Sequence, residues 1–283
     1  MIVVHVLGGL GNQLFQYAAA RALALRRGTT VGIDTRYFRK ARPRELELAN
    51  YELPTAPIDR RSLPPRKRHR MRRALWIALR SKPVVFREES LRFDSRVLSL
   101  PADTYLEGYF QSERYFEDAA SAIRADLTLQ RPLQPANVEW RARIRKGLAV
   151  SLHIRRGDYV SNPETNRVFG ALDLNYYLAA ADAMHERLRE PLRFFVFSDE
   201  PEWAKANLKL PYPTEFVDSD GPAVEHLALM SECRHHITAN SSFSWWGAWL
   251  NPAADKHVIA PKQWFLSPTL DASTLVPDRW QRL

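Results

Sequence analysis

The sequence contains a single cysteine, Cys233, so it cannot form an intramolecular disulfide bond. This scarcity excludes the disulfide-stapled scaffolds of small secreted proteins and is typical of a reducing compartment. The apolar runs are short, and none reaches the roughly 20 residues that a membrane-spanning helix needs. The first residues, MIVVHVLGGLGNQLFQ, carry neither a basic leader nor a small-residue cleavage site. We therefore expect a soluble, cytoplasmic protein.

Several catalytic signatures are also missing. There is no Cys-x-x-Cys pair and no Gly-x-Ser-x-Gly elbow, so redox and hydrolase functions lack their usual support. The eight histidines are scattered, and the adjacent His235 and His236 lie in an expected strand, where neighbouring side chains point to opposite faces. A histidine metal cluster is therefore not expected.

The charge is strongly positive, because 41 Lys and Arg outnumber 32 Asp and Glu and give a net charge of +9 and a pI of about 9.8. Much of the excess lies in Arg60-Arg61 and in the run from Arg66 to Arg73. Such clusters bind nucleic acids or anionic surfaces, although a solvated arginine-rich face is the simpler interpretation. We expect no nucleic-acid partner and consider peripheral membrane contact through Arg66–Arg73. A basic nucleic-acid or anionic-surface binding protein is the alternative class.

Strand-like and helical segments alternate along the chain. Apolar, β-branched runs predict strands at residues 1–7, 30–34, 104–110, 148–154, 193–197, 214–217 and 235–239. Helical patterns lie between them, at residues 12–27, 66–80, 112–125, 137–146, 175–189, 201–208, 223–232 and 243–250. Because this alternation favours parallel sheets, we predict an α/β protein of two Rossmann-like, doubly wound domains facing across a cleft. Pro132 and Pro135 mark the boundary between domains 1–135 and 136–283.

Two adjacent arginines follow the apolar strand at 148–154, within the run His153-Ile154-Arg155-Arg156-Gly157-Asp158-Tyr159. Open α/β sheets bind ligands at this carboxyl end of their strands. Neighbouring guanidiniums repel each other unless an anion lies beside them, and the planar fork of arginine suits phosphate oxygens. Asp158 can orient one arginine, and simple neutralisation of a surface arginine is the alternative. We predict a phosphate site.

A serine-rich segment, Asn240-Ser241-Ser242-Phe243, begins the helix that follows the strand at 235–239. Hydroxyls and unpaired N–H groups at a helix N-terminus form an anion site. Ordinary capping by Asn240 or Ser241 above a tryptophan core is an equal alternative. An arginine pair from the same sheet favours the anion site.

The run Gly8-Gly9-Leu10-Gly11-Asn12-Gln13 lets the backbone approach a ligand closely. It falls short of a dinucleotide fingerprint, because Leu14 stands where the third glycine is required. Asp34, at the end of the next expected strand, keeps a dinucleotide site open as an alternative.

Together these motifs resemble glycosyltransferase family 11, the α-1,2-fucosyltransferases. The resemblance rests on four stretches that follow in order across nearly the whole chain: residues 9–13, 153–159, 197–200 and 229–248. It implies a GT-B-like fold, GDP-β-L-fucose as the donor and a galactose-terminated glycan as the acceptor. It also implies inversion to an α-1,2 linkage, with no metal or other cofactor.

The resemblance implies roles for individual residues as well. It places Arg155 and Arg156 on the donor phosphates, with His153 and Asp158 beside them. The other donor-binding candidates are Gly9, Gly11, Asn12, Gln13, Ser198, Asp199, Glu225, His226, Asn240, Ser241, Ser242 and Phe243. A departing GDP gains negative charge in the transition state, which preorganised guanidiniums stabilise. We expect the N-terminal domain to bind the acceptor.

Two positions depart from the family pattern. Glu225-His226 precede Leu227, where relatives often carry an aspartate thought to read guanine, so guanine recognition by this pair is less secure than phosphate binding. Pro163 stands where distant fucosyltransferases carry an acid, and Glu164 follows it. Asp158 and Glu164 are therefore both candidates for the general base, and a dissociative route that needs little base is the alternative.

One further motif, Asp218-Ser219-Asp220, has the Asp-x-Asp spacing of many metal-dependent glycosyltransferases. These residues precede Gly221-Pro222 and an expected helix, a setting more typical of a turn and an N-cap. We assign no metal. A different donor or linkage remains an alternative, because residues 40–110 carry few interpretable signals, and the oligomeric state is not predicted.

Overall fold

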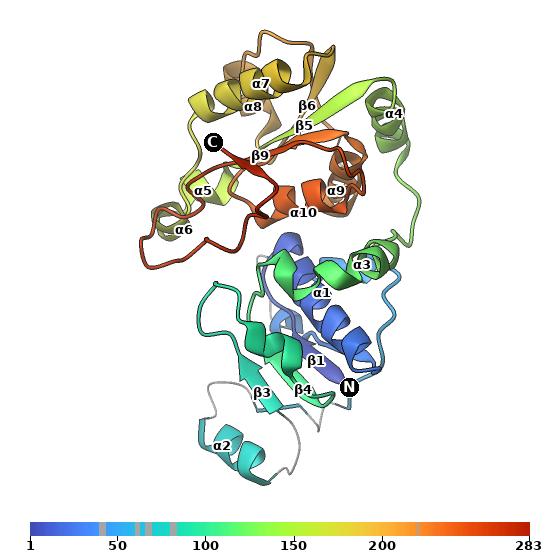
Figure 1. Cartoon of the computed structure of the whole chain (residues 1–283), viewed down its shortest axis with the longest axis vertical. Coiled ribbons are helices and arrows are strands. Elements are labelled where there is room, and N and C mark those ends of the chain that lie inside the picture. Colours follow the sequence, from blue (N-terminus) through green and yellow to red (C-terminus); the bar gives the residue numbers. More distant parts are fainter. Residues whose placement is uncertain (40–43, 60–62, 66–69, 80–83, 220) are drawn as a thin grey trace. The chain divides into compact units, whose positions relative to one another are not determined.

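The chain divides into two compact units, Met1–Gln130 and Arg131–Leu283 (Figure 1). The computed structural model describes all residues except 40–43, 60–62, 66–69, 80–83 and 220. The first four residues of the basic run Arg66–Arg73 therefore lie outside the described residues. Across the described part of the chain, no helix has the length and apolar character needed to cross a membrane.

The first unit is built on a four-stranded sheet whose strands pair in parallel. Its strands are β1 (Ile2–His5), β2 (Val31–Asp34), β3 (Val84–Arg87) and β4 (Thr104–Glu107), in the order β2-β1-β4-β3. The carboxyl ends of β1, β4 and β3 are consequently neighbours. The sequence pattern predicts β1, β2 and β4 but not β3.

The helices of the first unit are α1 (Leu10–Arg26), α2 (Arg70–Leu79) and α3 (Ala120–Asp126). Short 3-10 turns cover Arg36–Arg39, Glu47–Asn50, Ser95–Ser99, Glu113–Tyr115 and Glu117–Ala119. The expected helix at 112–125 is therefore wrong over its first half. Phe116, whose φ of −147° and ψ of 11° are not helical, separates the two turns there.

The glycine-rich turn between β1 and α1 has a clear steric reason. Gly8 has a φ of +83°, and a Cβ at this position would lie 2.8 Å from the side-chain nitrogen of Asn12. Only glycine adopts such a backbone without strain. The turn delivers Gly9 to the N-cap of α1, whose fully buried Leu14 and Phe15 join the core of the unit.

The second unit contains a six-stranded parallel sheet in the order β10-β9-β8-β5-β6-β7. The strands are β5 (Leu148–Ile154), β6 (Leu192–Ser198), β7 (Thr214–Phe216), β8 (His235–Ile237), β9 (Val258–Ala260) and β10 (Gln281–Arg282). The chain moves outward from β5 through β6 to β7, then returns to the other side of β5. This is the doubly wound order, and its switch point lies between β5 and β8.

Helices cover both faces of this sheet (Figure 1). They are α4 (Pro135–Ile144), α5 (Gly157–Ser161), α6 (Pro163–Val168), α7 (Leu174–Leu188), α8 (Pro201–Asn207), α9 (Ala223–Glu232) and α10 (Ser242–Leu250). One core joins β5 and β6 to α7 and α8, and a second joins Phe195 and Phe197 to α4 and α9. Burial of one large apolar side chain contributes about 1.5–3 kcal/mol, so these layers hold the strand ends rigidly.

Candidate functional site

Three groups of predicted site residues in the second unit lie at the carboxyl ends of strands β5, β6 and β8, around the switch point of its sheet. The arginine pair follows β5, the segment Asn240–Phe243 follows β8, and Ser198-Asp199 ends β6 and begins the next loop. Because all three strands are parallel, their carboxyl ends meet at one edge. Ligands of doubly wound sheets bind in the crevice at this position.

Arg155 is oriented by two carboxylates. Its guanidinium forms an ion pair with Asp158, and its Nη1 lies 2.7 Å from Oδ2 of Asp199. The guanidinium carbon also lies 5.3 Å from the centroid of the Tyr159 ring. These contacts restrict the arginine rotamer before any ligand arrives, which is the preorganisation that anion binding needs.

Arg156 has a separate set of partners. Its Nε donates to Glu200 at 3.0 Å, and its guanidinium carbon stacks 3.5 Å from the centroid of Trp203, at the start of α8. Its backbone N–H donates to Oδ1 of Asp199 at 2.9 Å. A cation over an indole face contributes about 0.5–2 kcal/mol, so Trp203 fixes the position of this guanidinium.

The carboxylate of Asp199 consequently contacts both arginines, the guanidinium of Arg155 and the backbone N–H of Arg156. Gly157, the first residue of α5, permits this approach, because a Cβ there would overlap Oδ2 of Asp199. The resemblance implies that Asp199 lies near guanosine, and that contact stays a prediction. Its observed bonds make it the organiser of the arginine pair.

The arginine pair and the carboxylates that contact it do not add up to a positive charge. Two guanidiniums face three carboxylates, those of Asp158, Asp199 and Glu200. A guanidinium nevertheless has five N–H donors, of which these ion pairs use only a part. Recognition of a phosphate here therefore depends on directed hydrogen bonds rather than on excess local charge.

His153 lies beneath the arginine pair, 4% exposed, with its ring 5.4 Å from that of Phe243. Burial, helped by the charge of Arg155, lowers the pKa of His153 to about 3. Its Nδ1 is buried without a hydrogen-bond partner among the described residues. A neutral imidazole at this position can accept or donate one hydrogen bond but cannot serve as a cationic acid near neutral pH.

The segment after β8 combines capping with support. Ser241 caps α10 by accepting the N–H of Phe243 at 3.3 Å, while Ser242 and Phe243 are half-buried. The buried side chain of Asn240 donates to the carbonyls of Phe169 and Gly170 and also to that of Trp264. Asn240 therefore ties its own segment to two other loops, and a direct donor contact from its amide stays a prediction.

The glycine loop of the first unit is braced by glutamines of α1. Gln13 donates to the carbonyls of Gly8 and Glu45, and its oxygen accepts the N–H groups of Glu47 and Leu48. Its side chain is completely buried. The structure thus gives Gln13 a supporting role, and donor contacts by Gly9, Gly11, Asn12 and Gln13 stay predictions.

The contacts of Asp34 argue against a dinucleotide site at the end of β2. The carboxylate of Asp34 has no exposed side-chain surface, forms a bidentate pair with Arg36 and accepts the Tyr105 hydroxyl at 2.6 Å. Hydrogen bonds from Arg36 and Tyr105 hold the pKa of Asp34 below its usual value despite burial. A nucleotide ribose would have to displace two well-placed partners.

The remaining candidates occupy varied positions. Ser198 accepts the N–H of Glu200, Glu164 is exposed in the first turn of α6, and Asp158 pairs with Arg155. Glu225 accepts the backbone N–H of Gln134 and the side-chain amide of Asn137 at 2.7 Å.

His226 bonds Ser219 on the neighbouring loop. Glu225 therefore anchors the start of α4, and the structure leaves guanine recognition by Glu225 and His226 a prediction.

Within the described residues, no group of three or more His, Cys, Asp and Glu side chains is arranged to hold a metal ion. Asp220 lies outside the described residues, so the Asp218-Ser219-Asp220 motif is only partly described. Asp218 contacts Lys205 at 3.3 Å.

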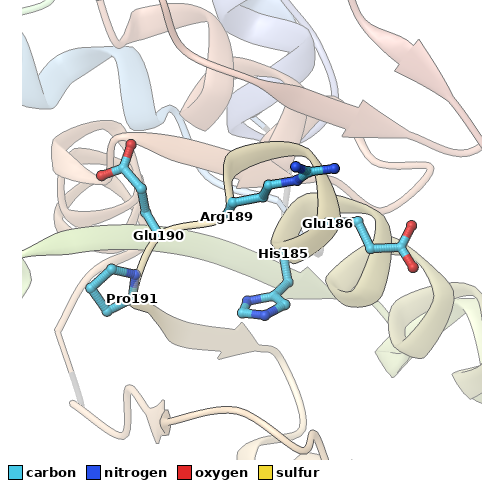
Figure 2. Close-up of a pocket in the computed structure, with 5 residues that line it drawn as sticks. All are labelled: His185, Glu186, Arg189, Glu190 and Pro191. Carbon is cyan, nitrogen blue, oxygen red and sulfur yellow. The ribbon is translucent and has the colours of Figure 1, made fainter.

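A separate surface pocket of about 520 Å³ lies at the C-terminal end of α7, lined by His185, Glu186, Arg189, Glu190 and Pro191 (Figure 2). Its polar side chains point in different directions, with the carboxylates of Glu186 and Glu190 on opposite sides. The pocket precedes β6, at the amino edge of the sheet, and includes no predicted site residue.

A family model, Glycosyl transferase family 11, matches residues 78–281. The chain belongs to glycosyl transferase family 11. The match begins before β3 and includes the second unit as far as residue 281, with its arginine pair. The family resemblance of the sequence motifs is thereby confirmed.

Several curated proteins align over most of the chain. An α-1,2-colitosyltransferase of Escherichia coli is 32% identical and covers 100% of this chain and 99% of its own length. The O-antigen biosynthesis glycosyltransferase WbnK of Escherichia coli is 30% identical, with 98% of both chains covered. Galactoside α-(1,2)-fucosyltransferase 1 of Plecturocebus brunneus is 26% identical over 86% of this chain and 63% of its own.

Solved structures show the same fold. Arabidopsis thaliana FUT1 in complex with GDP has a TM-score of 0.54 at 10% identity, covering 98% of this chain and 74% of that one. Fucosyltransferase NodZ from Bradyrhizobium has a TM-score of 0.51 at 18% identity, and the match covers 87% of this chain and 92% of the NodZ chain. The family 11 chain described here is therefore α/β and GT-B-like, as expected.

Sequence patterns miss two supporting residues of the site. Glu200 and Trp203 hold Arg156, yet they lie more than forty positions along the chain from it. Glu200 belongs to a motif that carries the resemblance, which is a signal for its importance but not for its partner. Trp203 has no such signal, because only the pairing of β5 with β6 brings it to Arg156.

Proposed function

We propose that this family 11 glycosyltransferase moves L-fucose from GDP-β-L-fucose to the 2-hydroxyl of a galactose-terminated glycan, with inversion and without a metal. The observation that carries the proposal is the arginine pair at the switch point, positioned by Asp199, Glu200 and Trp203. Relatives named as α-1,2-fucosyl- and α-1,2-colitosyltransferases support the linkage.

In this mechanism the guanidiniums of Arg155 and Arg156 donate to the oxygens of the leaving diphosphate. Negative charge grows on those oxygens as the bond to the sugar breaks, so fixed donors stabilise the transition state more than the ground state. The N-terminus of α10, where the backbone N–H groups of Ser242 and Phe243 lie, would add partial positive charge. Asp158 and Glu164 remain the two candidates for the base.

Colitose is the second donor candidate, favoured by the full-length relative that is 32% identical. Colitose is fucose without its 3-hydroxyl, so both sugars present the same anomeric chemistry. A site that hydrogen-bonds the 3-hydroxyl discriminates against the deoxy sugar by a large factor, because its polar partners are then left unpaired.

A matrix of reactions tests the proposal. GDP-fucose, GDP-colitose, GDP-mannose and UDP-galactose are each incubated with β-galactosides and with a glucoside control, with and without EDTA, and product linkages are read by NMR. We expect an α-1,2-fucosylated galactoside that forms in EDTA. Preferred transfer of colitose would replace the donor assignment, dependence on metal would refute the metal-free mechanism, and a product fucosylated elsewhere would refute the linkage.

Peripheral membrane contact through Arg66–Arg73 is a further part of the proposal, supported only by the charge of the sequence. Co-sedimentation with phosphatidylglycerol vesicles should fall when these arginines are replaced by glutamine. Unchanged sedimentation would refute this contact.

A further inference from the structure

A carboxylate holds two consecutive backbone N–H groups at the carboxyl edge of the first unit. Glu88 directly follows β3, and its Oε2 accepts the N–H of Tyr109 at 2.6 Å while its Oε1 accepts that of Phe110 at 3.0 Å. Both donors lie in the loop after β4, the strand that pairs with β3. Glu88 thus ties together two neighbouring strand ends.

The loop that Glu88 holds is strained. Phe110 has a φ of +54°, in the left-handed region, and its side chain is completely buried against Tyr115, with ring centroids 5.6 Å apart. A bulky residue adopts this conformation at a cost of about 1–3 kcal/mol, which surrounding contacts must offset. Gly108 is required as well, because a Cβ there would overlap the Glu88 side chain.

This anchored loop presents Tyr109 to solvent. Tyr109 is 38% exposed, although the residue after it is buried. Two residues after Tyr109, the side-chain amide of Gln111 donates to Oδ1 of Asn12 at 2.8 Å, which ties the loop to the first turn of α1. The carboxyl edge therefore brings an exposed aromatic ring next to a carboxylate, and the hydrogen bond between the amides of Asn12 and buried Gln111 supports their loop.

These groups suit a neutral sugar better than a nucleotide. The C–H face of a pyranose packs against an aromatic ring, and its hydroxyls donate to carboxylate and amide oxygens. A carboxylate offers about four acceptor positions, of which the two backbone bonds of Glu88 use two. A carboxylate also repels phosphate oxygens. Burial raises the pKa of Glu88 to about 7, so near neutral pH the group can both accept and donate.

We propose that Glu88 and Tyr109 form a subsite for a neutral pyranose of the acceptor glycan, with the Tyr109 ring as its platform and the Asn12–Gln111 hydrogen bond holding the loop in place. The identification of this sugar as the acceptor rests on the proposed function. The strained backbone at Phe110 directly follows the exposed Tyr109 ring. This ring lies at the edge where ligands of parallel sheets bind, and strain is common at binding sites.

The kinetic test compares Tyr109→Ala and Glu88→Gln with the wild-type enzyme. We expect the KM for a β-galactoside acceptor to rise about tenfold in Tyr109→Ala, equal to about 1.4 kcal/mol, while the Kd for GDP changes less than about twofold. The acceptor KM of Tyr109→Phe, which keeps the ring, should lie between that of the wild type and that of Tyr109→Ala. The matched control for Glu88→Gln is Glu89→Gln, since Glu89 is 79% exposed and forms a long ion pair of 3.5 Å with Arg96.

Two kinetic outcomes would overturn the subsite: an unchanged acceptor KM in Tyr109→Ala, or an equal loss of GDP affinity. Tyr109→Ala removes a partly exposed ring and leaves the backbone bonds to Glu88 intact, so it keeps the test valid if Glu88→Gln does not fold.

A second measurement does not depend on transfer. Saturation-transfer NMR of methyl β-D-galactoside should show contact with the wild-type protein and a loss of signal in Tyr109→Ala. If no donor supports transfer but this pattern appears, the subsite stands and the proposed function fails. If fucose transfer occurs but the NMR signals of wild type and Tyr109→Ala are equal, or the wild type shows none, the subsite is wrong and the proposed function stands.

Discussion

Asp199 and Arg155 form an ion pair of 2.7 Å across the ends of two neighbouring strands. The register of the sheet produces this contact, because Ile154 pairs with Ser198 and the next residue of each strand is Arg155 or Asp199. The second oxygen of Asp199 accepts the backbone N–H of Arg156. One carboxylate therefore fixes both arginines, and the predictions below follow from this arrangement.

Replacement of Trp203 should weaken donor binding through Arg156. In Trp203→Leu the guanidinium loses its stacking partner, and we expect the Kd for GDP to rise about two- to thirtyfold, corresponding to about 0.5–2 kcal/mol. Trp140→Leu is the matched control, because Trp140 stacks with Arg143 at 4.3 Å on α4. Equal effects of both variants would show that Trp203 acts only through general stability.

Gly157→Ala should disrupt the arginine pair. The added methyl group would overlap Oδ2 of Asp199, so this carboxylate has to shift and its ion pair with Arg155 is weakened. We expect a loss of about 1–3 kcal/mol in the free energy of unfolding and at least a tenfold lower kcat/KM. Urea denaturation and steady-state kinetics measure both.

The control for this substitution is Gly147→Ala, whose Cβ would come no closer than 4.0 Å to its nearest neighbour, Arg193. A Gly157→Ala enzyme as active as Gly147→Ala would contradict the organising role of Asp199.

His153 should remain neutral throughout the working range of the enzyme. Its folded-state pKa of about 3 lies below the ordinary value of 6.5, so stability from the neutral form is present above 6.5 and is lost as the pH falls toward 3. NMR of ¹⁵N-labelled histidine should show no titration of His153 between about pH 5 and 8. A midpoint near 6.5 would contradict its burial.

Glu88 should give the opposite pH dependence. Its pKa is raised from 4.5 to about 7 by burial, so the folded state binds the proton more tightly and loses stability as the pH rises from about 4.5 to 7. The difference in unfolding free energy between wild type and Glu88→Gln should therefore shift in favour of the variant across this range. A difference that does not change with pH would refute the raised pKa.

Much of this fold could be predicted from sequence because its signals are local. The strands β1, β5 and β6 are apolar runs with glycine or charged residues after them, and the arginine pair is visible at the end of one of these runs. Because ligand sites of parallel sheets lie at strand ends, this position and the chemistry of two adjacent guanidiniums together led to the hypothesis of a phosphate site.

Other elements carried weak local signals. β9 spans only Val258–Ala260, and β3 follows Pro83 and has exposed residues at both ends, so neither shows strand alternation. The expected helix at 112–125 is interrupted at Phe116, whose backbone angles are not helical and whose side chain is completely buried.

The supporting contacts of the site depend on register. Trp203 reaches Arg156, and Glu88 reaches Tyr109, only after neighbouring strands pair, and no spacing within the sequence encodes such distances. Asn240 and Gln13 show the converse case. Both stand in recognisable motifs, yet their amides hold backbone carbonyls and N–H groups of distant loops.

The most direct test of the central claim is calorimetric titration of the metal-free protein with GDP-fucose, GDP-mannose, UDP-galactose and NAD, repeated with Arg155→Ala and Arg156→Ala. The account predicts selective binding of GDP-fucose by the wild type and at least a tenfold weaker Kd in each variant, because each loses charge-assisted bonds to phosphate. Wild-type affinity in both folded variants, or a preference for UDP-galactose or NAD, would contradict it.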